Sequence, residues 1–256
     1  ILKTLDADTL LEKLLALPRS DLNTLLLKLL QMQAAATTPK ELLGSHKSSR
    51  FTSPSALDPA AYHLLERRLL SLAQEAGISG VLLSPAAPAA SCSAFGYVAQ
   101  NNVISALRGT ELLPDPTNML AIIIAEALTG KKIDNREPLH YCTTARVVRA
   151  QMLPDIPGFH SHFGIFCIVS SGKDRGSYAC EKALLIKQVG YYKQLFLDKF
   201  QAKLSVSLRK RSGYPDNDGF WARITEVIRA ELPDVPLSLD FEDEGNGYYK
   251  GINFKL

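Results

Sequence analysis

The sequence lacks an apolar run long enough to cross a membrane as a helix. Such a helix needs about 20 apolar residues, whereas the best candidate, residues 119–128, is too short and contains Glu126. The pattern of a secretory signal, a basic segment followed by an apolar core, is also missing. The sequence therefore predicts a soluble protein without a membrane segment, and the cytoplasm is the expected compartment.

Closely spaced metal or redox ligands are missing as well. The four cysteines form no C-x-x-C pair, which argues against zinc-knuckle and redox motifs and predicts reduced thiols: Cys92, Cys142, Cys167 and Cys180. His160 and His162 could share a metal from alternate strand positions, but two ligands without a third do not make a site. No metal centre is predicted.

A strong charge of one sign is the third absence. The 29 basic and 26 acidic residues give a net charge of +3, too small to predict a nucleic-acid or membrane surface. The dense basic run at residues 209–211 (R-K-R) is interpreted as a solvated loop, with a phosphate-backbone contact as the alternative. With 256 residues, 46% of them hydrophobic, the chain can bury a substantial core.

Apolar periodicity divides the chain into three parts. Residues 1–36 predict a helical hairpin, capped at Asp8 and Ser20, whose leucine-rich face we expect to pack on its own domain, with a docking surface as the alternative. Residues 37–59, rich in Ser, Thr and Pro, predict a linker or surface loop. Residues 60–256 are expected to form the main domain.

Within the main domain the pattern alternates between helices and strands. Helices are predicted at residues 62–76, ended by Gly77, at residues 118–128, capped by Thr117 or Asn118, and at residues 176–200 and 219–232. A short buried strand is predicted at residues 81–83. Further strands are predicted at residues 139–149 and 163–170 as a long hairpin, and at residues 237–241 and 248–254 as a final pair. The fold class is therefore α+β.

Four segments, in this order, resemble the class II aminoacyl-tRNA synthetase core in its histidyl-like form. Residues 77–85 (G-I-S-G-V-L-L-S-P) resemble motif 1, and residues 112–117 (L-L-P-D-P-T) resemble the histidyl L-R-P-E-x-T box. Residues 145–151 with residues 161–163 resemble motif 2, the strand-loop-strand that grips ATP. Residues 248–254 (Y-Y-K-G-I-N-F) are similar to the histidyl signature Y-Y-T-G-x-x-F.

The resemblance implies an antiparallel sheet flanked by helices over residues 60–256, with the N-terminal helical hairpin outside it. It also implies a homodimer through the motif 1 region and ATP with Mg²⁺ as cofactor. Motif 3, which carries the second ATP-binding arginine, is expected beyond Leu256. The same core occurs in the regulatory subunit type of ATP phosphoribosyltransferase, which lacks the same catalytic arginines.

The resemblance assigns roles to individual residues. Arg149 would be the catalytic cation against the ATP α-phosphate, because negative charge accumulates there as a carboxylate attacks. The other nucleotide-binding residues would be Gln151, His162 and the adenine-stacking Phe163, for which an ordinary inward-facing strand residue is the alternative. The substrate-binding residues would be Asp115, Thr117, Glu181, Tyr248 and Tyr249.

The departures from the histidyl pattern set the functional hypothesis. Leu113 and Glu244 stand where that family has arginines, and Asp115 replaces a glutamate. We therefore expect a paralogue that binds a small carboxylate or amino acid, with ATP as a further ligand, and that does not charge tRNA with histidine. The alternatives are an ATP-dependent ligase that adenylates another acid and a non-catalytic protein-interaction module.

Two loops are interpreted conservatively. Residues 91–93 (S-C-S) could line a ligand pocket, but a surface turn is the preferred interpretation. Residues 170–176 resemble a phosphate-binding turn only superficially, because they lack P-loop spacing.

Overall fold

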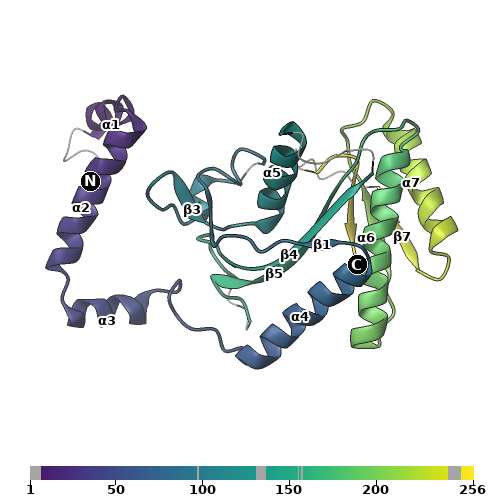
Figure 1. Ribbon diagram of the computed structural model, residues 1–256, viewed down its shortest axis with the longest axis horizontal. Coiled ribbons are helices and arrows are strands. Elements are labelled where there is room, and N and C mark those ends of the chain that lie inside the picture. The colour runs from purple at the N-terminus through teal and green to yellow at the C-terminus, as the bar shows by residue number, and fades with distance from the viewer. Residues whose placement is uncertain (1–6, 97, 131–136, 155, 157, 242–248) are drawn as a thin grey trace.

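The computed structural model describes residues 7–96, 98–130, 137–154, 156, 158–241 and 249–256. The chain has α+β architecture, with the long β4–β5 hairpin at its centre and helices on both sides (Figure 1). Within these ranges no helix is both long and apolar enough to span a membrane.

The N-terminal helices α1 (Ala7–Leu15), α2 (Arg19–Ala36) and α3 (Pro39–Ser48) lie beside the rest of the molecule (Figure 1). No residue of α2 is buried, and five of its large apolar side chains are 39–61% exposed: Leu25, Leu27, Leu29, Leu30 and Met32. The expectation that the leucine-rich face packs on its own domain is therefore wrong. One hydrogen bond joins α2 to the core at Asn23, whose Oδ1 accepts the Arg108 backbone N–H at 2.9 Å.

Two local predictions for this region are corrected by the backbone. Ser20 does not cap α2, because the N-cap is Pro18 and the Ser20 hydroxyl donates to Asp21 Oδ1 at 3.1 Å inside the helix. The predicted linker at residues 37–59 contains α3, because Thr38 and Glu41 form a capping box. The Glu41 carboxylate accepts the Thr38 N–H at 2.8 Å, and the Thr38 hydroxyl accepts the Glu41 N–H at 3.3 Å.

Helix α4 (Pro59–Glu75) confirms the first helix of the main domain, and Gly77 follows it at a φ of +71°. The strand predicted at residues 81–83 is wrong. The strand β1 is Ser79–Gly80, which pairs in parallel with β4 over two residues before the chain turns away. Leu82, predicted to be buried, is 96% exposed.

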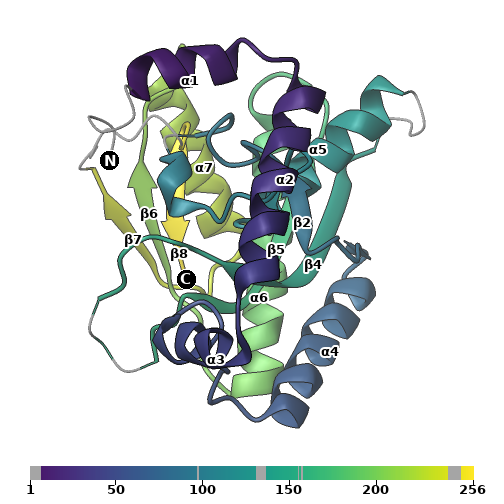
Figure 2. The ribbon, with the colours of Figure 1, turned by 90° about the vertical axis from the view of Figure 1, so that its left-hand side faces the viewer.

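The hairpin of β4 (Leu139–Val148) and β5 (His162–Ser171) confirms the predicted pair of long strands. Residues alternate between its two faces, so that Val147 and its partner Phe163 share one face while Arg146 and Gly164 share the other. Helices α4 and α6 (Ala179–Phe200) cover one face, and α5 (Pro116–Thr129) packs on the other (Figure 2).

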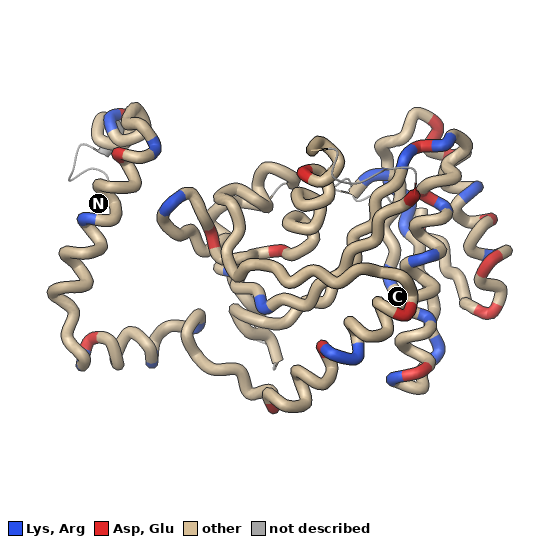
Figure 3. The backbone as a smooth tube through the Cα atoms, viewed as in Figure 1, with Lys and Arg blue, Asp and Glu red and all other residues tan. Residues whose placement is uncertain are grey.

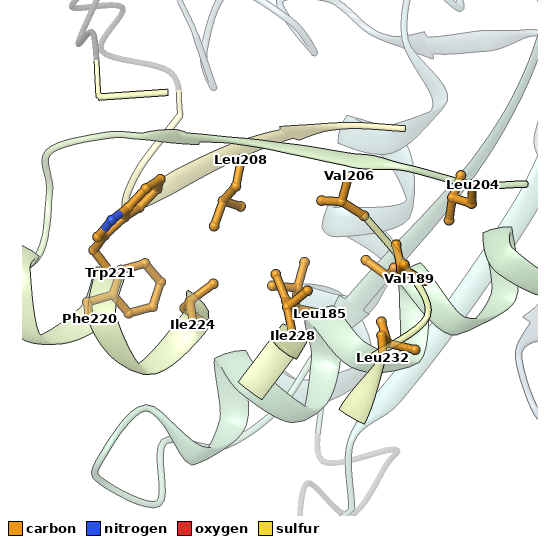
Figure 4. Close-up of a cluster of buried hydrophobic side chains, with 11 residues drawn as sticks. Leu185, Val189, Leu204, Val206, Leu208, Phe220, Trp221, Ile224, Ile228 and Leu232 are labelled. Atoms are coloured by element: carbon orange, nitrogen blue, oxygen red, sulfur yellow. The ribbon is translucent and has the colours of Figure 1, made fainter. Parts of the chain in front are cut away.

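The C-terminal part is a second sheet with its own core. Strand β6 (Val206–Lys210) lies between β7 (Leu237–Asp240) and β8 (Ile252–Lys255), parallel to the first and antiparallel to the second. The final two strands therefore exist, but both pair with β6. Helix α7 (Asn217–Glu231), α6 and β6 together bury one apolar cluster (Figure 4): Leu185, Val189, Val206, Leu208, Phe220, Ile224 and Ile228. Each such side chain contributes about 1.5–3 kcal/mol.

The basic run at residues 209–211 is not a solvated loop. It belongs largely to β6, where the Arg209 guanidinium lies 2.6 Å from Asp240 Oδ2 and Lys210 pairs with Asp218. Basic and acidic residues are interspersed along α6 and α7 (Figure 3). The run is therefore interpreted as part of a network of ion pairs.

Candidate functional site

The N-terminus of α5 forms one side of the candidate site. Its N-cap is Asp115, where the sequence predicted Thr117 or Asn118. The Asp115 Oδ1 atom accepts the Thr117 backbone N–H at 2.9 Å and the Thr117 hydroxyl at 2.6 Å. A carboxylate here is stabilised by the helix dipole as well as by these hydrogen bonds. Asp115 is thus held in one orientation, with its second oxygen free for another partner.

That partner is Arg149, the first residue after β4. Its Nη2 atom lies 3.5 Å from Asp115 Oδ2, its Nε donates to the Pro114 carbonyl at 3.0 Å, and its guanidinium stands over the Phe163 ring, 5.3 Å from the centroid. The Arg149 backbone N–H donates to the Ser161 carbonyl at 2.8 Å and closes the loop between the strands. Three residues predicted separately therefore meet at one place.

The Arg149–Asp115 pair is loose and partly solvated. The two side chains are 28% and 29% exposed. Pairs of this kind contribute only about 0–1 kcal/mol, because water and salt screen them. Arg149 can therefore exchange Asp115 for an incoming anion at small cost.

A cavity of about 680 Å³ is lined on one side by Asp115, and Arg149 reaches it through its contact with that carboxylate. It is bounded by α5, by the β5 strand, by α6 and by the C-terminal segment: Cys92, Val98, Asp115, Thr117, Asn118, Ile168, Val169, Ser170, Gln188 and Tyr249. Three of the five predicted substrate-binding residues line it, namely Asp115, Thr117 and Tyr249. Tyr248, like Glu244, lies outside the described residues.

The loop at residues 91–93 is not a surface turn, because a buried carboxylate draws it inward. Glu111 on β3 (Thr110–Leu112), which pairs with β2 (Ala86–Pro88), is 0% exposed. It accepts the backbone N–H groups of Ala90 and Ser91 at 3.0 Å, the Ser91 hydroxyl at 2.6 Å and the Gln100 amide at 2.8 Å. Gln100 begins the short 3-10 helix η2 (Gln100–Asn102). Cys92 is thereby placed in the cavity wall.

Hydrogen bonding also sets the charge of Glu111. Burial alone opposes the charged form, but the hydrogen bonds from Ser91, Gln100 and the backbone outweigh it and lower the pKa of the Glu111 carboxyl. Sequence reasoning missed this residue. Its only signal was a carboxylate between Thr110 and Leu112, and a solvent-exposed glutamate would give the same sequence pattern.

His162 does not join the site. It lies next to Phe163 in β5 and therefore on the opposite face of the hairpin. There its Nε2 lies 2.6 Å from the Ser53 carbonyl oxygen and its Nδ1 lies 2.5 Å from Arg146 Nη2. The predicted contact of His162 to a nucleotide beside Arg149 would require a different orientation of the strand.

Gln151 and Glu181 are also placed apart from the cavity. The Gln151 side chain is exposed. Glu181, in the first turn of α6, accepts the Tyr214 hydroxyl at 3.1 Å and does not line the cavity. Among the described residues, no three His, Cys, Asp or Glu side chains gather as a metal site, and His160 and His162 form no such group.

Sequence reasoning also missed Arg50, just after α3. Its guanidinium reaches both ends of the loop that follows Arg149. It donates to the Ala150 carbonyl at 2.5 Å, to the Gln151 carbonyl at 2.9 Å and to the Ser161 hydroxyl at 2.9 Å. Arg50 therefore holds the loop at residues 149–161 from a segment that the sequence predicted to be a linker. No local sequence pattern predicts a contact between residues 100 positions apart.

No protein-family model and no curated protein matches this sequence. Solved structures resemble it in fold. A proposed threonyl-tRNA synthetase from Aeropyrum pernix superposes with a TM-score of 0.58 over 75% of this chain and 46% of its own, at 13% identity. The apo histidyl-tRNA synthetase of S. aureus gives 0.55 over 79% of this chain and 54% of its own, also at 13% identity.

This chain therefore spans about half the length of each of those proteins. A further likeness, to an ATP phosphoribosyltransferase regulatory subunit/histidyl-tRNA synthetase from Bacillus halodurans C, has a TM-score of 0.46 and is too weak to bear on the fold. The order of elements in this chain and the two stronger superpositions indicate the same fold. The chain has the α+β fold of the class II aminoacyl-tRNA synthetase core.

Proposed function

We propose that the cavity binds a small carboxylate, most simply a free α-amino acid, through the Arg149–Asp115 pair. The observation that carries the proposal is the 3.5 Å separation of these opposite charges beside a cavity. An amino-acid zwitterion presents the complementary pair of charges. Arg149 offers a planar guanidinium that matches a carboxylate, and Asp115 with Thr117 offers oxygen acceptors for an ammonium group.

The residue before Pro114 supports a role other than charging tRNA with histidine. Leu113 occupies the position of an arginine in the histidyl box, and it is 2% exposed in an apolar cluster with Ala87 and Val147. A cation cannot replace it there without losing its solvation. The chain therefore lacks a positive charge at that position.

ATP with Mg²⁺, the cofactor that the resemblance implies, fits these residues only in part. Arg149 and Phe163 lie together, but the guanidinium stands over the ring at 5.3 Å, where an adenine would stack. His162 is bonded on the opposite face of the hairpin. A nucleotide would therefore require Arg149 to move, and the proposal of an amino-acid site does not depend on ATP.

Thermal unfolding of the protein with each of the free L-amino acids tests the proposal. At least one of them should raise Tm, and the Asp115→Asn variant should lose that shift while keeping the helix cap. If none raises Tm, the alternative of a protein-interaction module is favoured. Amino-acid-dependent exchange of pyrophosphate into ATP would instead favour the alternative of an adenylating ligase.

We also propose a homodimer through the motif 1 region. The segment from α4 to Leu82 borders a groove of about 920 Å³, and the Leu82 side chain beside it is 96% exposed. A leucine this exposed is stabilised when a second copy covers it. Light scattering should give twice the monomer mass for the native protein and the monomer mass for Leu82→Asp; a native monomer would contradict the proposal.

Localisation to the cytoplasm is proposed from the cysteines. All four are free, and three of them are buried, which suits a reducing compartment. Burial raises the pKa of the Cys167 thiol to about 12, so it is not a reactive thiolate. Mass spectrometry of the protein from cells should find four unmodified thiols, and an internal disulfide would contradict the proposal.

A further inference from the structure

A hydrogen-bonded cluster lies where β5 and α6 line the cavity, on the face of the β4–β5 hairpin opposite to Phe163. Gln188 and Ser170 both line the cavity, and Gln188 Nε2 donates to Ser170 Oγ at 2.9 Å. The Ser170 Oγ atom also lies 2.8 Å from Nδ1 of His140, its partner residue across the β4–β5 ladder. The three side chains come from three elements and form one connected network.

The environment of this cluster favours its uncharged form. Burial, followed by the nearby charge of Lys187, lowers the pKa of His140 and so favours the neutral imidazole. A neutral imidazole with its proton on Nε2 accepts a hydrogen bond from the Ser170 hydroxyl at Nδ1. Ser170 then accepts from Gln188, whose amide still has a carbonyl oxygen and a second N–H for other partners.

The described residues in the remaining wall of the cavity offer no other charge for the far end of a ligand. Of the described residues that line it, Asp115 alone is charged, and it belongs to the Arg149 pair. Cys92, Val98 and Ile168 supply apolar contact. An acidic side chain would find no cation here, and a basic side chain would find no second carboxylate.

We infer that Gln188 and Ser170 form a subsite for an uncharged hydrogen-bonding group, so that the ligand is an amino acid with an amide or hydroxyl side chain. The inference rests on the proposed function and names the substrate class of the same cavity. A ligand with an apolar side chain of the same size would leave the carbonyl oxygen and the second N–H of Gln188 without a hydrogen bond from the ligand. The cost of that mismatch gives the selectivity.

Calorimetric titration with matched amino acids tests the inference. Glutamine, methionine and glutamate form one set of similar size, and threonine and valine form another. In the set that binds better, the amide or hydroxyl member should bind about tenfold more tightly than its apolar or charged counterparts, the value expected for one or two hydrogen bonds.

Gln188→Met should abolish this preference while retaining binding, because the zwitterion contacts at Asp115 are unchanged. Ser170→Ala provides a second variant if Gln188→Met does not fold. Equal binding of glutamine and methionine, and of threonine and valine, would overturn the subsite and leave the amino-acid site standing. Binding of none of the five, with none of the free L-amino acids raising Tm, would overturn both proposals.

Discussion

Arg149 Nη2 lies 3.5 Å from Asp115 Oδ2, which joins the end of β4 to the N-cap of α5. The two residues are 34 positions apart, by subtraction of their numbers, and belong to different motifs of the class II resemblance. Their contact makes the end of the hairpin and the start of α5 a single charged unit beside the cavity. This unit therefore has both a structural role and a proposed binding role, which different substitutions separate.

Replacing Arg149 should affect binding more than stability. Arg149→Met removes the positive charge but keeps most of the side-chain length, so the free energy of unfolding should change by less than about 1 kcal/mol, as for an exposed ion pair. Binding of the amino acid should weaken by about ten- to a hundredfold, because a charged hydrogen bond contributes about 1.5–3 kcal/mol. Calorimetry measures the second effect and urea denaturation the first. Equal binding by Arg149→Met would remove Arg149 from the site.

Asp115 should show both roles, and two substitutions separate them. Asp115→Ala removes the N-cap of α5 and should cost about 1 kcal/mol of unfolding free energy. Asp115→Asn keeps a capping oxygen, so it should lower the unfolding free energy by only a few tenths of the cost of Asp115→Ala. Both variants should nevertheless lose ligand binding. The idea fails if Asp115→Asn binds the amino acid as well as the native protein does.

Arg50 should act as a positioning residue for the loop at residues 149–161. Arg50→Ala removes the donors to Ala150, Gln151 and Ser161, so the loop should be cleaved faster in limited proteolysis. Ligand affinity should fall severalfold, and Arg50→Lys should restore part of it. Lys47→Ala, an exposed change on the preceding helix α3, is the matched control. Unchanged cleavage of the loop in Arg50→Ala would contradict this role.

Glu111 should make stability depend on acid. Because its pKa is lowered in the folded protein, the unfolded chain takes up the proton first as the pH falls. Its contribution is therefore fully present above about pH 4.3, the usual glutamate pKa, and is lost as the pH falls further, through the lower folded pKa. Unfolding titrations from pH 7 to pH 3 measure this.

The matched pair for that experiment is Glu111→Gln and the exposed Glu231→Gln. Glu111→Gln should cost about 1–3 kcal/mol at pH 7, because an amide group then faces the donors of Ala90, Ser91 and Gln100. It should also flatten the pH dependence, whereas Glu231→Gln should change neither. An unchanged acid slope in Glu111→Gln would show that other carboxylates set it.

The elements with a clear period could be predicted from the sequence. The β4–β5 hairpin and helices α4, α6 and α7 all appear close to their expected bounds. The errors fall where a local signal was short or ambiguous. Three apolar residues at 81–83 predicted burial, but β1 pairs over only two residues and leaves Leu82 exposed. The capping box at Thr38 could have been recognised in the sequence, but the Ser, Thr and Pro content of residues 37–59 was given more weight.

The site was partly predictable for a different reason. The motif order identified Arg149, Phe163 and Asp115 because each follows or begins a regular element, and the fold brings those ends together. His162 was misplaced because the face of a strand reverses with every residue. Arg50 and Glu111 were missed because their partners are distant in sequence, and contacts of that kind leave no periodic trace.

Calorimetric titration with three related molecules tests the central claim most directly. The amino acid that gives the largest shift in Tm is compared with its decarboxylated amine and its deaminated acid, each of which keeps the side chain and one of the two charges. If Arg149 and Asp115 read a zwitterion, the amino acid should bind at least about tenfold more tightly than either analogue, since each lost charged contact contributes about 1.5–3 kcal/mol. An acid or amine that binds as tightly as the amino acid would contradict the claim.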